Sequence, residues 1–149
     1  MSKMVLMLED DVTSALYREN MEAAGYDVYH ATNFSAAWEW TEIDPGIEAF
    51  DFLIVDLAIV PMTMNQKMLF TAEENAEMER LNERTGCSLN GWIWLKKIIR
   101  ERAFKGKAIV ISAFMEALPD DEKGNYKPVV FIDKTEPNAL LKLFSELKG

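Results

Sequence analysis

Charged side chains close several of the apolar runs in this sequence. Glu9 and Asp10 follow the run MVLML, and Asp56 follows FLIV in the stretch FDFLIVDLAIV. Lys134 comes after the run VVFI and one intervening aspartate. Because a carboxylate embedded in apolar surroundings is costly to bury without a partner, we expect Asp56 to end its strand beside solvent, a cation or other polar groups.

These residue types suit phosphoryl transfer when they lie together. Close carboxylates repel one another and cannot all stay ionised without a counter-charge. A hard divalent cation supplies that charge, and Mg²⁺ is typical where phosphates are handled. Asp56 would then be a nucleophile that forms an aspartyl phosphate, while Lys134 holds one phosphoryl oxygen and Ser112 hydrogen-bonds another.

Alternating apolar patterns predict the elements that bring these residues together. The predicted strands are 4–8, 26–31, 50–55, 108–111 and 129–132. The predicted helices are 12–24, 34–43, 88–104 and 137–148. This alternation indicates a parallel sheet with helices on both faces, whose ligands bind at the carboxyl ends of the strands. We therefore expect the acids, the hydroxyl and the lysine to meet at one edge.

Helical spacing predicts which side chains the helices bury. In 12–24 the expected inner face is Val12, Leu16 and Ala23, and in 88–104 Ser88 is the expected N-terminal cap. The four tryptophans form two pairs spaced by two residues, and one of each pair is expected to face inward: Trp38, Trp40, Trp92 and Trp94.

Composition limits the classes of protein to consider. The chain has 149 residues, 49% apolar content and a net charge of −9, which suits one globular domain over 1–149 and argues against direct nucleic-acid binding. The first apolar run is too short for a membrane span, and Cys87 has no second cysteine to pair with, so we expect a cytoplasmic protein without membrane insertion. His30, the only histidine, is expected on the surface of an edge strand.

The motifs LMLEDD, FLIVD, IVISA and VFIDK occur in this order, each at a predicted strand end. Together they resemble a response-regulator receiver domain of two-component signalling, and the resemblance covers nearly the whole chain. It implies a flavodoxin-like α/β fold with a doubly wound five-stranded parallel sheet in the order 2-1-3-4-5. It also implies Mg²⁺ as cofactor, a histidine kinase or phosphotransfer protein as phosphoryl donor, and a downstream protein target.

The resemblance assigns roles to individual residues. Asp56 resembles the phosphoacceptor and Lys134 the family's lysine, while Ser112 and Phe131 resemble the switch hydroxyl and the switching aromatic. The implied metal ligands are Glu9, Asp10, Asp56 and the backbone carbonyl of Ala58. No free-standing enzyme is implied, only a protein that catalyses its own phosphorylation and slow dephosphorylation.

An insertion separates this chain from the family pattern. Pro61 and Gly91 resemble residues that the family places in one short loop, and here the segment 62–90 lies between them. A capping-box pattern at Thr71 predicts a helix to about Arg84, with Gly86 as its stop. Its apolar seam is Ala72, Ala76 and Leu81. This helix is interpreted either as a surface addition or as a lid or docking element beside Asp56.

Three further departures concern the remaining loops. The segment 114–128 is polar with a proline and a glycine, which predicts a short or broken fourth helix. Thr135 replaces the family's proline after Lys134, so a cis bond is not expected there. Ala58 and Phe114 occupy positions that tune dephosphorylation in the family; both are apolar and cannot orient a water molecule, which predicts a long-lived phosphoaspartate.

Two other functions stay open at this point. One is a pseudo-receiver that binds protein partners constitutively without phosphorylation, for which the insertion and the broken helix argue. The other is a Mg²⁺-dependent phosphatase with Asp56 as nucleophile. Such enzymes usually carry a second carboxylate two residues on, where this chain has Ala58.

Overall fold

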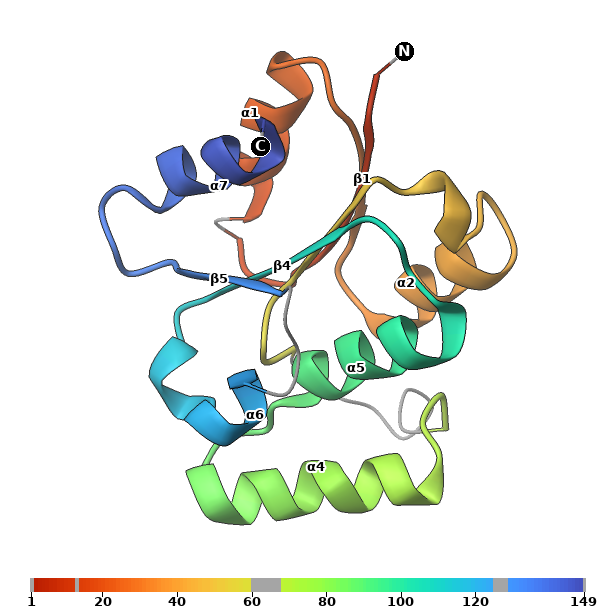
Figure 1. Cartoon of the computed structure of the whole chain (residues 1–149), viewed down its shortest axis with the longest axis vertical. Helices are drawn as coiled ribbons and strands as arrows, with labels where there is room; N and C mark the ends of the chain where they lie inside the picture. Colours follow the sequence, from red (N-terminus) through yellow and green to blue (C-terminus); the bar gives the residue numbers. More distant parts are fainter. Residues whose placement is uncertain (1, 13, 60–67, 125–128, 149) are drawn as a thin grey trace.

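Five parallel strands form the centre of the chain in a computed structural model, which describes residues 2–12, 14–59, 68–124 and 129–148 (Figure 1). The strands are β1 (Met4–Leu8), β2 (Asp27–Ala31), β3 (Phe52–Val55), β4 (Lys107–Ser112) and β5 (Val130–Asp133). Their order is β2-β1-β3-β4-β5, and each neighbouring pair is parallel. The predicted doubly wound sheet in the order 2-1-3-4-5 is therefore confirmed.

Helices cover both faces of this sheet, as the pattern of alternation predicts. The helices α1 (Ser14–Ala23) and α7 (Ala139–Lys148) lie on one face, and α2 (Phe34–Glu42) and α5 (Asn90–Arg102) lie on the other (Figure 1). Successive strand residues point to opposite faces, so Met7 and Ile54 join the core under α1 and α7, whereas Leu6 and Leu53 join the core under α2 and α5. Because both faces are covered, the two central strands β1 and β3 are apolar throughout.

The inserted segment contains α4 (Ala72–Thr85), which forms a third layer outside α5 (Figure 1). Thr71 caps it in a capping box with Glu74, and Gly86 ends it at a φ of 76°, a left-handed conformation that glycine adopts without strain. The predicted helix and both of its boundaries are confirmed. Pro61 and the first part of the segment 62–90 lie outside the described residues.

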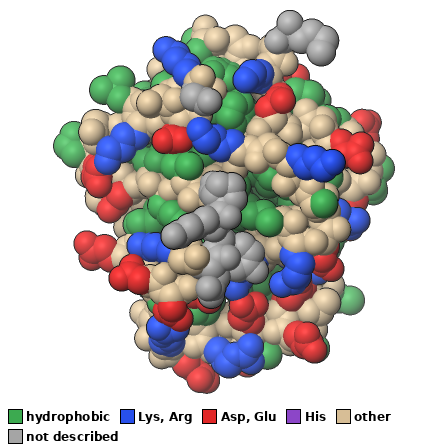
Figure 2. Space-filling model, in the orientation of Figure 1, with side chains coloured by type: hydrophobic (Ala, Val, Ile, Leu, Met, Phe, Trp, Pro, Cys, Tyr) green, Lys and Arg blue, Asp and Glu red, His purple; other side chains and the backbone are tan. Residues whose placement is uncertain are grey.

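Buried ion pairs join α4 to α5. The Glu74 carboxylate accepts hydrogen bonds from Lys97 Nζ at 2.8 Å and from Arg100 at 3.2 Å, and Lys96 binds both Glu77 of α4 and Glu122. The buried face of α4 is Glu74, Met78 and Leu81, so the predicted seam is wrong at Ala72, which is exposed. Acidic and basic side chains are interspersed over the outer side of α4 (Figure 2). The helix is an integral layer, not a loosely attached addition.

The predicted inner face of the first helix is wrong. Val12 is 90% exposed and Leu16 57% exposed, and Ala23 also faces solvent. The buried residues of α1 are Ser14 and Met21. Met21 fills the core beneath the sheet, while the Ser14 hydroxyl donates to the Asp11 carbonyl, so the helix is rotated away from its most apolar sequence positions.

The start of α5 also differs from the prediction. Its N-terminal cap is Leu89, without a side-chain hydrogen bond, and Ser88 is exposed. Trp92 and Trp94 are both fully buried, although one of the pair was expected outside, because α4 covers the face of α5 that points away from the sheet.

The segment after β4 contains a 3-10 turn, η2 (Met115–Ala117), and a five-residue helix, α6 (Asp120–Gly124). These confirm the predicted short and broken fourth helix, although residues 125–128 lie outside the described part of the chain. A second 3-10 turn, η1 (Ile47–Ala49), precedes β3, and the bond between Lys134 and Thr135 is trans, as predicted. Within the described ranges, every helix is too short or too polar to cross a membrane.

Candidate functional site

Asp56 lies at the carboxyl edge of the sheet, directly after β3. Its backbone N–H donates to the Leu8 carbonyl at 3.0 Å, and its side chain is buried, so that the residue is only 4% exposed. Glu9 follows the neighbouring strand β1, and its N–H donates to the Ala31 carbonyl at 3.0 Å. Because β1 and β3 pair in parallel register, the two carboxylates meet, as the sequence predicts.

Lys134 follows the edge strand β5, and its side chain reaches both carboxylates. Its backbone N–H donates to the Ser112 carbonyl at 3.0 Å, which fixes the loop after β5. Its Nζ atom contacts Glu9 Oε2 and lies 3.2 Å from Asp56 Oδ2 and 3.8 Å from Asp11 Oδ2. One buried ammonium therefore compensates the charge of carboxylates contributed by two other strands.

The electrostatics of this cluster reflect its burial. Burial raises the pKa of Glu9 from 4.5 to about 8, the hydrogen bond and charge of Asp56 add to the rise, and Lys134 opposes it. Burial acts against the charged form of Lys134, but its hydrogen bond with Glu9 and its attraction to Asp56 leave its pKa raised. The ammonium therefore stays charged, and the Glu9 carboxyl favours its neutral, protonated form even with Lys134 beside it.

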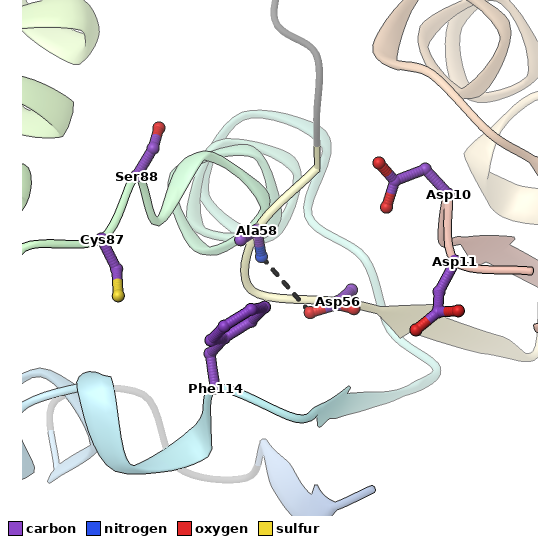
Figure 3. Close-up of a pocket in the computed structure, with 7 residues that line it drawn as sticks. All are labelled: Asp10, Asp11, Asp56, Ala58, Cys87, Ser88 and Phe114. Atoms are coloured by element: carbon purple, nitrogen blue, oxygen red, sulfur yellow. Dashed lines mark hydrogen bonds between the residues drawn. The ribbon is translucent and has the colours of Figure 1, made fainter. Parts of the chain in front are cut away.

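A cavity of about 430 Å³ opens beside Asp56 (Figure 3). Its lining residues come from four segments of the chain: Asp10, Asp11, Asp56, Ala58, Cys87, Ser88 and Phe114. Asp10 and Asp11 lie on the β1 side, whereas Cys87, Ser88 and Phe114 lie on the opposite side of Asp56 (Figure 3). Asp56 Oδ1 accepts a hydrogen bond from the Ala58 N–H at 3.3 Å. The cavity is thus acidic on one wall and less polar on the other.

Three of the four residues that could hold a metal ion line the cavity, and Glu9 does not. Asp10, Asp56 and Ala58 line the cavity, whereas the Glu9 side chain accepts hydrogen bonds from Lys134 and from the Asp11 N–H. Within the described ranges, no group of three or more His, Cys, Asp or Glu residues is arranged to hold a metal. The donors that face the cavity are oxygen atoms, which by type suit a hard cation such as Mg²⁺ or Ca²⁺.

The two predicted switch residues share one face of the sheet, with Ser112 at the end of β4 and Phe131 on the neighbouring strand β5. Ser112 is fully buried, and its Oγ accepts a hydrogen bond from the Phe114 N–H at 3.0 Å. Phe131 is half-buried, with its ring 5.8 Å from that of Trp92 and 5.9 Å from Lys123 Nζ. Ser112 is therefore tied to the loop that lines the cavity, while Phe131 faces α5 and α6.

His30 was expected on the surface, but it is half-buried and supports the acidic loop. Its Nε2 atom lies 2.9 Å from the Glu9 carbonyl and 3.1 Å from Ser14 Oγ. The histidine is the last residue but one of β2, which pairs with β1, so strand pairing brings it close to the sheet edge that carries the acids. No local sequence signal identifies such a role, because the partner atom belongs to the backbone of another strand.

Two other residues of the site were not recognised from the sequence as a functional unit. Asn90 is fully buried, and its side-chain amide binds the backbone of Ile59. Gly91, predicted only as the glycine that opens a helix, packs against the carbonyl group of Asp56. The dipeptide Asn-Gly after a polar stretch is itself the available signal, since it marks a special backbone position.

Comparison with known proteins adds a relationship at the level of structure. No family model and no curated protein matches the chain. A response regulator from Thermotoga maritima aligns with a TM-score of 0.58 and 17% identity over 99% of this chain and 96% of its own. Chemotaxis protein CheY4 of Vibrio cholerae aligns with a TM-score of 0.62 and 16% identity over 98% of both chains.

A third similar structure shows a chemical state of interest. It is a response regulator from Burkholderia pseudomallei that contains a phosphorylated aspartic acid, a calcium ion and citrate. Its TM-score is 0.57 at 15% identity, over 99% of this chain and 71% of the other. At such low identity, these similarities establish a shared fold.

Proposed function

From the fold of response-regulator receiver domains, which this chain has, we propose that it is a receiver that accepts a phosphoryl group on Asp56. One observation carries the proposal: the buried Asp56 carboxylate lies 3.2 Å from the Lys134 ammonium and lines a cavity that Asp10 also lines. The proposed donor is a phosphohistidine of a histidine kinase or phosphotransfer protein.

The proposed reaction follows from the groups at this site. A carboxylate oxygen of Asp56 attacks the phosphorus atom, the bond from phosphorus to the donor's imidazole breaks, and the imidazole keeps the electron pair and takes up a proton. Lys134 lies within reach of one Asp56 oxygen and would donate a charge-assisted hydrogen bond to the bound phosphoryl group. A hard cation held by Asp10, Asp56 and the Ala58 carbonyl, with Glu9 beside it, would neutralise phosphoryl charge.

The proposed output is a change in affinity for a protein partner. Phosphorylation adds negative charge beside Ser112 and shifts a two-state equilibrium that includes Phe131. Phe131 contacts Trp92 and Lys123, so a change in its position would alter the surface that α5 and α6 form. The chain would act in the cytoplasm and catalyse only its own phosphorylation and slow dephosphorylation.

Intact-mass measurement after incubation with acetyl phosphate and Mg²⁺ tests this function. A single phosphoryl adduct is expected for the wild-type chain and for Asp51→Asn, which changes an aspartate at the opposite end of β3. No adduct is expected for Asp56→Asn. An adduct that persists in Asp56→Asn, or none in any variant with either acetyl phosphate or a phosphorylated histidine donor, would contradict the proposal.

A constitutive protein-interaction module is the second candidate function. Lys134 already bridges Glu9 and Asp56, so the acidic cluster is charge-compensated without a metal ion. That arrangement is compatible with a pseudo-receiver that never carries phosphate. Titration with Mg²⁺, followed by tryptophan fluorescence and calorimetry, separates the two: saturable binding that Asp56→Asn weakens supports the receiver, and no binding supports the interaction module.

A further inference from the structure

Asn90 lies at the start of α5 and binds the loop that follows the proposed phosphoacceptor. Its Oδ1 atom accepts a hydrogen bond from the Ile59 N–H at 2.7 Å, and its Nδ2 atom donates to the Ile59 carbonyl at 2.7 Å. Asn90 is 0% exposed. The side-chain amide thus satisfies both backbone groups of one buried residue, as a neighbouring strand would.

Gly91 continues the same contact toward Asp56. Its N–H donates to the Leu57 carbonyl at 2.9 Å. A Cβ atom at this position would lie 1.8 Å from the Asp56 carbonyl oxygen and 3.1 Å from the Leu57 carbonyl carbon. The backbone of residues 56–59 therefore lies directly on the first turn of α5, at a distance that only glycine permits.

These contacts hold the Asp56 backbone from both directions. On the upstream side, the Asp56 N–H is bound to the Leu8 carbonyl of β1. On the downstream side, Asn90 and Gly91 bind Ile59 and Leu57. Asn90, the last residue of the segment 62–90, thus binds Ile59, which precedes that segment in the chain.

We propose that Asn90 is a positioning residue that holds the Asp56 carboxylate in line with the phosphoryl donor. The inference rests on the proposed receiver function. The Asn90 amide binds the Ile59 backbone, so its effect acts through the backbone of residues 56–59. Loss of its side chain would leave two buried backbone groups of Ile59 unpaired, and the loop would shift to find new partners.

The expected effect falls on the rate of phosphoryl transfer. A displacement of about 1 Å between reacting atoms can slow a reaction by about 100-fold. We therefore expect Asn90→Ala and Asn90→Leu to lower the maximal rate of phosphorylation by acetyl phosphate by about 10- to 100-fold. Asn90→Leu keeps the branched shape of the side chain and removes both hydrogen bonds, so it separates the bonds from the loss of side-chain atoms.

A control variant must lose stability without touching the site. Leu147→Ala serves this purpose, because Leu147 is buried near the end of α7, where Glu146 binds Lys107 at the start of β4 and therefore at the opposite sheet edge. Each variant is assayed at the same interval below its own Tm, with excess Mg²⁺. A rate in the Asn90 variants that equals that of Leu147→Ala would overturn the positioning role.

Hydrogen exchange gives a second readout that does not require phosphorylation. The Ile59 amide donates to Asn90, so its protection should fall selectively in both Asn90 variants, while the amides of α7 keep theirs. If the wild-type chain takes no phosphoryl group from any donor, the proposed function fails and this readout alone decides whether Asn90 holds the loop. Unchanged protection of Ile59 would overturn the inference in either case.

Discussion

The substitution Gly91→Ala tests how closely α5 supports the phosphoacceptor. Ordinary van der Waals contact begins near 3.4 Å, and the added methyl carbon would lie 1.8 Å from the Asp56 carbonyl oxygen. The two backbones would have to separate by about 1.6 Å. Since the clashing atom belongs to the backbone, a change of side-chain rotamer cannot relieve it.

We expect Gly91→Ala to lower the free energy of unfolding. Alanine in place of glycine within a helix ordinarily stabilises it by up to about 1 kcal/mol. Forced separation of well-packed groups costs about 3 kcal/mol, so we expect a net loss near 2 kcal/mol in the free energy of unfolding. For a chain of 149 residues, that corresponds to a Tm lower by roughly 6 °C. Displacement of Asp56 should slow its phosphorylation by about 100-fold.

Thermal unfolding and intact-mass kinetics with acetyl phosphate check both expectations. Gly124→Ala is the matched control, because a Cβ atom there meets nothing within 4 Å among the described residues. The control should keep the wild-type Tm and rate. If Gly91→Ala also kept both, the close approach of α5 to Asp56 would be wrong, and with it the reasoning that this helix positions the nucleophile.

Three further substitutions test other parts of the structure. Glu74→Gln removes the buried partner of Lys97 and Arg100 and should lower the free energy of unfolding in urea by about 2 kcal/mol, whereas Glu73→Gln, at an exposed position of the same helix turn, should leave it unchanged. The raised pKa of Glu9, about 8, means that its stabilising contribution is present below pH 4.5 and is lost as the pH rises through 8. In chelator, Glu9→Gln should therefore flatten the fall of Tm over this range, and a wild-type slope in the variant would contradict the assignment. Phe114→Gln places a hydrogen-bonding group at the cavity and should shorten the lifetime of phosphorylated Asp56 by about tenfold. Leu141→Gln, at an exposed position of α7, should leave that lifetime unchanged. Equal lifetimes in the two variants would show that the apolar side chain of Phe114 does not set the rate of dephosphorylation.

The meeting of the acids and the lysine could be predicted from the sequence. Alternation of strands and helices requires parallel pairing, and parallel pairing places every strand's carboxyl end at one edge. A residue that directly follows a buried run, such as Glu9 or Asp56, is thereby assigned to that edge without knowledge of any contact. The same local logic located α4, because its capping box and its terminal glycine lie within the helix's own sequence.

The burial of the helices was decided by tertiary structure. The pattern in the expected helix 12–24 favours Val12 and Leu16 as the inner face. Both are exposed, because Ser14 and Met21 are the residues that α1 buries against the sheet. In α5, both Trp92 and Trp94 are buried because α4 covers the side away from the sheet. Helical period describes which residues share a face, but it does not say how many faces other elements cover.

The contacts of buried polar residues were also decided by tertiary structure. By residue type alone, Asn90 and His30 show no structural role, and each acquires one through an atom distant in the sequence: the Ile59 backbone and the Glu9 carbonyl. Glu74 is marked locally by its capping box with Thr71, but its bond to the Lys97 ammonium also joins distant segments. A hydrogen bond depends on where two groups lie in space, and no local pattern encodes a partner 20 or more residues away. The sequence by itself therefore determined which groups end the strands, and the folded chain decided which groups hold them in place.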